Sequence, residues 1–255
     1  MKLKHWLKVG RATAASTARG WQGLFAGRVA MQPVLRLKLY EFEACPFCRL
    51  VREALTELGL DAEIYPCPKG GQRFRQEAVA IGGKEQFPLL VDPNTGLVLY
   101  ESMQIIEYLY DQYAGRSLPW KYRAGPLQLI SSAANGLLGG MDGMTAKPSV
   151  QPEKPLELSS FEASPFCRPV RETLCELEIP YILHNLGKEQ WADMGAGGMH
   201  AAIGEYQPVK GGKREAFMKK TQKMMVPYLE DPNTGKALFE SEAIITYLRQ
   251  TYGQP

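Results

Sequence analysis

Apolar and polar residues alternate or recur in short runs that predict a regular succession of elements. Residues 35–42 alternate between the two kinds, which predicts a β-strand, and residues 61–65 form a second short strand. Between them, residues 45–58 carry apolar side chains at helical spacing, and Gly59 follows as a helix stop. The pattern therefore begins with a strand, a helix and a strand.

A hairpin and a further helix complete this pattern. Strands are predicted over 88–91 and 97–100, because the residues between them, Asp-Pro-Asn-Thr-Gly, are strong turn formers. Residues 102–113 then carry apolar side chains at helical spacing. The order of elements is βαβ, a variable segment, and ββα.

The whole pattern occurs twice. Residues 42–54 (FEACPFCRLVREA) and 161–173 (FEASPFCRPVRET) are identical at ten of thirteen positions, at an offset of 119. Residues 88–109 and 227–248 agree at fourteen of twenty-two positions, at an offset of 139. The chain is therefore a duplication, and the second copy has a central segment that is 20 residues longer.

The repeat sets the expected domain plan. We expect an N-terminal extension over 1–34, a first domain over 35–114 and a second over 155–255. The connection over 115–154 is predicted to hold one helix, at 127–138, followed by a Gly- and Pro-rich linker. A length of 255 residues fits two domains.

Charge is distributed unevenly between the extension and the rest of the chain. Residues 1–38 carry eight basic side chains and no acidic one, whereas the remainder has a net charge of −5. The composition is that of a globular protein, and no apolar run has the length of a membrane-spanning helix. Five cysteines, an odd number, do not describe a disulfide scaffold and favour a reducing compartment such as the cytoplasm.

The sequence Cys45-Pro46-Phe47-Cys48 falls where a strand gives way to a helix. Unpaired N–H groups at a helix N-terminus favour a thiolate on the first cysteine, whose pKa in such motifs falls to roughly 3.5–7.5. Cys48, one turn later, is placed to attack a mixed disulfide on Cys45. Arg49 and Arg52 are expected to add positive charge nearby. There are two alternatives. One is half of a zinc site, although the sequence has no second CxxC and no paired histidines to complete it. The other is an inert structural pair of cysteines.

These motifs resemble the glutaredoxin-like N-terminal domain of glutathione S-transferases. The resemblance rests on CPFC at a helix start, a proline that opens the third strand, and Glu-Ser at the start of the last helix. It covers about 80 residues of the first copy and about 100 of the second. It implies an α/β protein of two tandem thioredoxin-like domains, each with a mixed four-stranded sheet.

The resemblance also implies a glutathione site in each copy. The residue before the proline pairs its backbone with the cysteinyl part of glutathione, the proline is cis, and the Glu-Ser pair holds the γ-glutamyl group. In the first copy these residues are Phe87, Pro88, Glu101 and Ser102. In the second copy the candidates are Ser164, Cys167, Val226, Pro227, Glu240 and Ser241. The alternative for each Glu-Ser pair is a helix N-cap without a ligand.

The second copy departs from the pattern because Ser164 replaces the first cysteine. A serine there resembles the transferases that hold the glutathione thiolate with a hydroxyl, but it cannot form a mixed disulfide. A degenerate copy that is kept for packing is the alternative. Cys67, Cys167 and Cys175 are expected to remain thiols without a catalytic role.

Three functions fit these features. The first is glutathione-dependent thiol–disulfide exchange at Cys45, with glutathione as cosubstrate and a protein or small-molecule disulfide as partner. The second is glutathione conjugation of an electrophile, with a second pocket improvised between the domains. The family's helical C-terminal domain, which builds that pocket in its members, is expected to be replaced here by about 40 residues. The third is a non-enzymatic adaptor that binds glutathione or a partner at a membrane surface. No nucleic-acid partner is expected, and the histidines (His5, His184 and His200) lack metal-ligand spacing.

The basic extension has two short apolar stripes, one at Leu3, Trp6 and Leu7 and the other over 21–29. Intramolecular packing, reversible contact with an anionic membrane and a cleavable organellar transit peptide are the three interpretations. Several glycines, of which Gly10 is the first, are expected to weaken a continuous helix.

Overall fold

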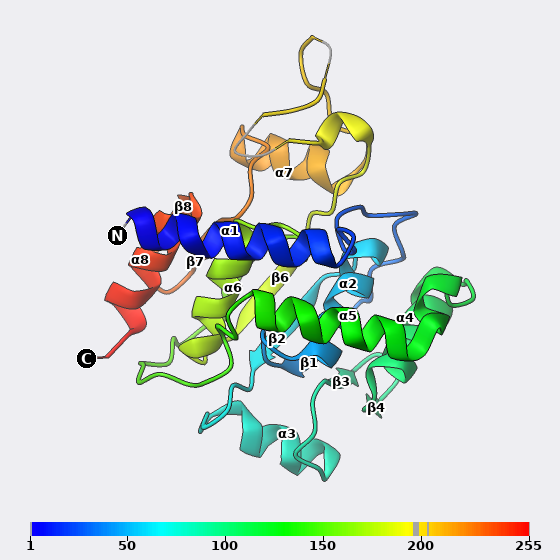
Figure 1. Cartoon of the computed structure of the whole chain (residues 1–255), viewed down its shortest axis with the longest axis vertical. Helices are drawn as coiled ribbons and strands as arrows, with labels where there is room; N and C mark the ends of the chain where they lie inside the picture. Colours follow the sequence, from blue (N-terminus) through cyan, green and yellow to red (C-terminus); the bar gives the residue numbers. More distant parts are fainter. Residues whose placement is uncertain (1, 196–198, 203, 255) are drawn as a thin grey trace.

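Each copy of the repeat folds into the predicted order of strands and helices (Figure 1). The computed structural model describes residues 2–195, 199–202 and 204–254. The first copy comprises β1 (Leu37–Glu41), α2 (Pro46–Leu58), β2 (Ala62–Pro66), α3 (Phe74–Gly82), β3 (Leu89–Asp92), β4 (Leu97–Leu99) and α4 (Ser102–Ala114). The second comprises β5 (Leu156–Ser160), α6 (Cys167–Glu176), β6 (Tyr181–Asn185), η2 (Trp191–Asp193), α7 (Lys213–Thr221), β7 (Tyr228–Asp231), β8 (Lys236–Phe239) and α8 (Ser241–Tyr252). The variable segments contribute α3 and α7, which the sequence pattern did not predict.

The two expected four-stranded sheets are halves of one sheet with the strand order β4-β3-β1-β2-β6-β5-β7-β8. Strands β2 and β6 join the halves as an antiparallel pair, in which Glu63 lies opposite Ile182. These two residues are equivalent in the repeat, so the copies are related by an approximate two-fold axis between them. Each copy thereby covers the exposed edge of the other, which removes two free strand edges.

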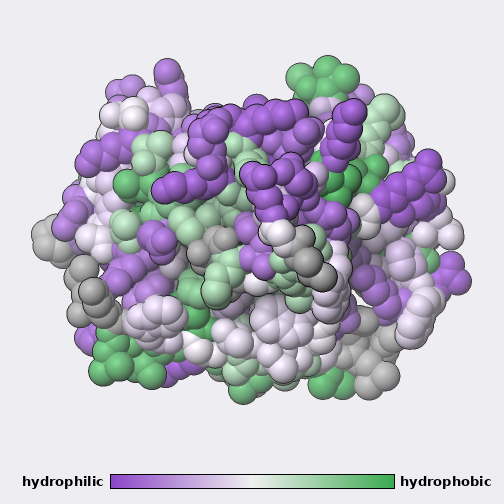
Figure 2. All heavy atoms as spheres, turned by 90° about the horizontal axis from the view of Figure 1, so that it is seen from above, coloured by the Kyte–Doolittle hydropathy of each residue, from purple (hydrophilic) through white to green (hydrophobic). Residues whose placement is uncertain are grey.

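Helices cover both faces of this sheet. The main hydrophobic core includes Leu37 and Leu39 of β1 and Leu156 and Leu158 of β5, and it continues into α2, α4, α6 and α8. On the opposite face, α3 packs over the first copy through Phe74, and α7 packs over the second copy in a separate cluster. Seen from above, hydrophilic side chains run across the surface and hydrophobic ones gather in separate patches (Figure 2).

Two further helices, α1 (Lys2–Ala18) and α5 (Gly125–Leu138), lie side by side over α2 and α6 (Figure 1). Helix α5 is the linking helix that the sequence predicted, and a short 3₁₀ helix, η1 (Trp120–Ala124), precedes it. Each helix is followed by a turn with two left-handed glycines, Gly20 and Gly23 after α1 and Gly140 and Gly143 after α5. The segments 1–34 and 115–154 are therefore structural counterparts. We use the word leader for the helix of each segment together with the glycine turn that follows it.

Each leader packs on the other copy. The hydroxyl of Ser16 in α1 donates to the carbonyl of Ala163, directly before Ser164, over 3.0 Å. In the same way, Ser132 in α5 donates to the carbonyl of Pro46 over 2.7 Å. The leaders therefore cross over, and each covers the start of the helix that carries the candidate site beneath it.

The N-terminal helix packs within the molecule, although not through the stripe that the sequence indicated. Val9, Ala12 and Ala15 are buried, whereas Leu3, Trp6 and Leu7 are 75%, 59% and 60% exposed. The helix also continues through Gly10, against expectation, because contacts with α5 and α6 offset a cost of about 1 kcal/mol for one glycine. None of the described helices combines the length and apolar character that crossing a membrane requires. Contact with a membrane surface stays a prediction.

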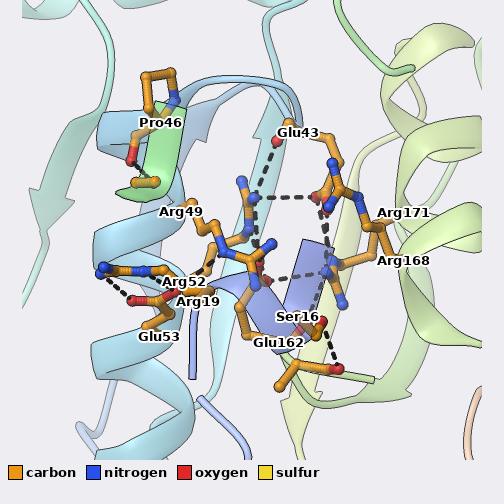
Figure 3. A network of polar contacts seen from close by, with 12 residues as sticks. Ser16, Arg19, Glu43, Pro46, Arg49, Arg52, Glu53, Glu162, Arg168 and Arg171 are labelled. Atoms are coloured by element: carbon orange, nitrogen blue, oxygen red, sulfur yellow. Dashed lines mark hydrogen bonds and ion pairs between the residues drawn. The ribbon is translucent and has the colours of Figure 1, made fainter. Parts of the chain in front are cut away.

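A buried ionic network lies between the copies, directly behind the candidate sites (Figure 3). Arg52 pairs with Glu162 at 2.9 Å, and its repeat equivalent Arg171 pairs with Glu43, the equivalent of Glu162, at 3.0 Å. Arg49 reaches both Glu53 and Glu162, at 3.0 Å and 3.4 Å. All these side chains are at most 4% exposed. Reciprocal pairing of equivalent residues holds the two copies in one orientation.

The ion pairs of His184 predict a pH dependence of stability. His184 on β6 contacts Asp61 at 3.2 Å and Glu157 at 3.1 Å. Burial lowers its pKa, but hydrogen bonds and charges of the two carboxylates outweigh burial and raise the pKa above 6.5. A raised histidine pKa stabilises the fold fully below pH 6.5, and this contribution is lost as pH rises through the folded-state value.

We therefore expect His184→Gln to lower the free energy of unfolding by up to about 1 kcal/mol at about pH 6, and by less at about pH 9. Urea denaturation at the two pH values measures the difference. A larger effect at pH 9 would refute the assignment.

Candidate active site

Cys45 caps the N-terminus of α2. Its sulfur accepts a hydrogen bond from the backbone N–H of Cys48 at 3.3 Å, and Pro46 occupies the first turn, where a missing N–H costs nothing. Hydrogen bonds from Cys48, the thiol first and the backbone N–H less strongly, lower the pKa of Cys45 although burial opposes them. Burial raises the pKa of Cys48. Both thiols are free, and their pKa values differ in the direction that a nucleophilic and a resolving cysteine require.

The arginines of the motif do not supply the positive charge that the sequence led us to expect beside Cys45. Arg49 and Arg52 point into the ionic network, where carboxylates pair with them. Glu41, which pairs with Arg52, instead opposes the charge on Cys45. Hydrogen bonding at the helix terminus therefore sets the thiol's pKa.

The fold brings Phe87 and Pro88 to the same end of the sheet as Cys45. Leu89 pairs with Tyr40 in the antiparallel β1–β3 ladder, so Pro88 lies beside the end of β1, from which the chain enters the CPFC turn. The Phe87–Pro88 peptide bond is cis. The ring of Phe87 contacts that of Phe42 edge to face, with the ring centroids 6.2 Å apart. The predicted cysteinyl-binding residues therefore lie at the end of the sheet where the chain enters the CPFC turn.

Glu101 and Ser102 open α4. Glu101 has φ 64°, an unfavourable left-handed value for a residue with a side chain, and its side chain forms no capping hydrogen bond. Its carboxylate accepts from the side-chain amide of Gln86 at 2.5 Å, while Ser102 is buried at the first helical position. Strain without capping argues against the N-cap alternative. A strained residue of this kind is typical of a functional site.

The second copy repeats this geometry. Ser164 accepts a hydrogen bond from the N–H of Cys167 over 3.2 Å, just as Cys45 does from Cys48. The Val226–Pro227 bond is cis, and Glu240 has φ 68° before Ser241, which opens α8. Cys167 is fully buried, which raises its pKa. The arrangement survives in this copy, but a serine stands in place of the first cysteine.

Comparison with known proteins decides the family. The family model for the glutathione S-transferase N-terminal domain matches residues 39–117 and again residues 158–255. The chain belongs to the glutathione S-transferase N-terminal domain family. Members of this family have a glutathione-related function.

Individual relatives match more weakly. A glutathione S-transferase-like protein of Aspergillus terreus, gedE, is 42% identical over 59 residues, which is 23% of this chain and 26% of that protein. The match thus spans about a quarter of that relative's length. Among solved structures, a delta-class glutathione transferase of Nilaparvata lugens is 19% identical over 56% of this chain and 80% of its own, with a TM-score of 0.28. The trimeric glutathione transferase TDR1 of Leishmania is 13% identical over 87% of this chain and 68% of its own, with a TM-score of 0.27.

In this glutathione S-transferase N-terminal domain protein, the first turns of α1 lie on the second copy's candidate site. Nε2 of His5 is 3.1 Å from the hydroxyl of Ser241, in the position that the family resemblance gives to the γ-glutamyl group. The ring of Trp6 contacts Phe166 of the SPFC turn edge to face, with the centroids 6.2 Å apart. Sequence reasoning missed these contacts, because nothing in the pattern links residue 5 to residue 241.

A cavity of about 520 Å³ adjoins Ser164. Its walls come from the turn after α1, from the SPFC turn, and from described residues of the long segment between β6 and α7. The extra length of the second copy was the sequence signal for this feature. Within the described residues, no group of three His, Cys, Asp or Glu side chains is placed to hold a metal ion.

Proposed function

We propose that the protein catalyses glutathione-dependent thiol–disulfide exchange at Cys45. The observation that carries the proposal is the lowered pKa of a thiol at a helix N-terminus, one turn before a second thiol whose pKa is raised. The Cys45 thiolate attacks the glutathionyl sulfur of a mixed disulfide, which releases the substrate thiolate and leaves glutathione bonded to Cys45. Cys48 then loses its proton and attacks Cys45, which releases glutathione and forms a Cys45–Cys48 disulfide. Two further glutathione molecules reduce that bond and leave as glutathione disulfide.

The site favours small disulfides. Cys45 is 3% exposed, because α5 passes over the start of α2. A rigid disulfide on a folded protein reaches a sulfur at this depth less readily than glutathione or a glutathionylated peptide does. The exchange partner is therefore a disulfide of glutathione itself or one carried on an extended peptide.

One set of assays separates the proposal from its alternatives. Turnover of a glutathionylated peptide, coupled to glutathione reductase, is the result that we expect. Conjugation of chlorodinitrobenzene without peptide turnover would support the transferase alternative instead. Absence of both activities would contradict the proposal and leave a binding role.

We also propose that glutathione binds the first copy through Phe87, Pro88, Glu101 and Ser102. Replacing Glu101 by Gln and Ser102 by Ala together is expected to weaken glutathione binding about 10- to 100-fold, since a charge-assisted hydrogen bond contributes about 1.5–3 kcal/mol. The concentration of glutathione disulfide that half-saturates modification of Cys45 measures this change.

The equivalent changes in the second copy, Glu240→Gln with Ser241→Ala, are the matched control. They should leave modification of Cys45 unchanged. Equal effects of the two double variants, or no effect of the first, would refute the site.

The second copy is expected not to support exchange by itself. Ser164 has no thiolate chemistry, and a hydroxyl without an adjacent base is a poor nucleophile. In full-length Cys45→Ser protein, adding Ser164→Cys should restore detectable peptide turnover, because the backbone donor to position 164 is in place. No recovery in a folded double variant would indicate a purely structural second copy.

A further inference from the structure

The cavity beside Ser164 has the size and lining of a small-molecule site. Its volume of about 520 Å³ lies within the range of roughly 300–1,000 Å³ for ligand pockets. Aromatic and methionine side chains dominate its walls, and they include Trp21 of the leader, Phe161, Phe166, Trp191 and Met224. These walls accommodate a hydrophobic body. The lining includes Ser164 and Val226 of the second copy's candidate site but not Cys45, so the cavity is separate from the site proposed for exchange.

Two buried cations face this cavity. Lys188 is 5% exposed, and its ammonium donates to the carbonyls of Asp193 and Gly195 and lies 5.7 Å from the centre of the Phe161 ring. Arg214, which is 3% exposed, donates to the carbonyl of Leu186 over 2.9 Å. Both cations are therefore held in place by backbone oxygens.

Among the described residues of the cavity wall, Asp193 is the one carboxylate, and other groups already engage it. Its oxygens lie 3.2 Å from Nε of Arg214 and accept hydrogen bonds from the hydroxyl of Tyr206 and the backbone N–H of Glu189, each at 2.7 Å. Lys188 forms no ion pair with a carboxylate in the described part of the chain. The wall thus carries one more positive than negative charge, in surroundings where an unpaired charge is costly. Burial accordingly lowers the pKa of Lys188 to about 8.

We propose that this cavity binds an apolar carboxylate, with the carboxylate on Lys188 and the hydrocarbon body against the aromatic and methionine walls. A charged head group supplies the counter-ion that Lys188 lacks. A neutral apolar molecule would fill the same volume but leave the ammonium unpaired. Charge therefore sets the specificity of the site, and shape sets the size of the ligand.

Binding of decanoate and of decan-1-ol to the full-length protein tests this proposal. Tryptophan fluorescence reports occupancy, since Trp21 and Trp191 line the cavity. Decanoate should bind more tightly than decanol, and Lys188→Met should weaken decanoate about 10- to 100-fold while leaving decanol unchanged. Lys69→Met is the matched control, because Lys69 is the exposed equivalent of Lys188 in the first copy. It should change neither affinity.

A pH titration on the wild-type protein provides a test that does not depend on the folding of a variant. The groups around Lys188 are Asp193 and His200, whose pKa values are lowered, Cys167, whose pKa is raised, and the guanidinium of Arg214. Raising the pH from about 7 to about 9 therefore neutralises mainly Lys188, and decanoate should bind more weakly while decanol does not. Equal affinity for the two probes, an unchanged affinity in Lys188→Met, or no binding of decanoate would each overturn the proposal.

Discussion

Replacing Cys45 with serine is expected to reduce glutathione-dependent disulfide reduction to the uncatalysed rate. The hydrogen bonds that stabilise a thiolate at position 45 do not turn a hydroxyl into a nucleophile, and the nearby carboxylate of Glu41 is engaged by Arg52. Steady-state turnover of a glutathionylated peptide measures the loss. A Cys45→Ser protein that retains the full rate would show that another group carries the reaction.

Two further variants test whether the loss of activity is specific to the role assigned to Cys45. Cys48→Ser should keep the first step and accumulate the glutathione adduct, because no thiol is left to resolve it. Cys67→Ser is the control, since Cys67 is buried beneath α3 and burial raises its pKa. The rate of this control should equal that of the wild type.

Replacing Glu162 with glutamine is expected to lower the free energy of unfolding by about 3–5 kcal/mol. Glu162 lies between Arg49, Arg52 and Arg171, and these charges outweigh the effect of burial and lower its pKa to about 2. Removing its charge takes a shared counter-ion from three buried guanidinium groups at the junction of the two copies, which are then balanced less well by the carboxylates that also pair with them, Glu41, Glu43 and Glu53. Urea denaturation, followed by circular dichroism, measures the change.

An exposed ion pair supplies the matched comparison. Arg75 pairs with Glu85, whose side chain is 60% exposed, and such pairs contribute between about 0 and 1 kcal/mol. Glu85→Gln should therefore change stability little. Similar effects of Glu85→Gln and Glu162→Gln would contradict the role assigned to the buried network.

The elements with strong periodicity were predictable from the sequence. Helix α2 was predicted within a residue of its bounds, because its apolar residues recur at helical spacing and it ends at a left-handed glycine. Helices α3 and α7 were not predicted. Each buries only two of its nine residues, so neither shows an apolar stripe that local pattern can detect. The single sheet was also missed, since the pairing of β2 with β6 follows from contacts between the copies.

The candidate site likewise has residues that the sequence predicted and contacts that it did not. CPFC, the two prolines and the two Glu-Ser pairs lie in conserved order within the repeat, and local pattern together with family resemblance found them. Arg49 and Arg52 both pair with Glu162, which is more than 100 residues away in the chain, so their orientation could not be read from local pattern. The two leaders share little sequence beyond their glycines, so their equivalence became visible only from the left-handed turns. Long-range packing, which periodicity does not encode, accounts for what was missed.

Intact mass spectrometry of Cys48→Ser protein treated with glutathione disulfide tests the central claim most directly. The account predicts one added glutathione per chain, mapped by proteolysis to Cys45, and no addition to a Cys45→Ser, Cys48→Ser double variant. A protein without an adduct, or one whose adduct lies on Cys67, Cys167 or Cys175, would contradict the assignment of Cys45 as the nucleophile.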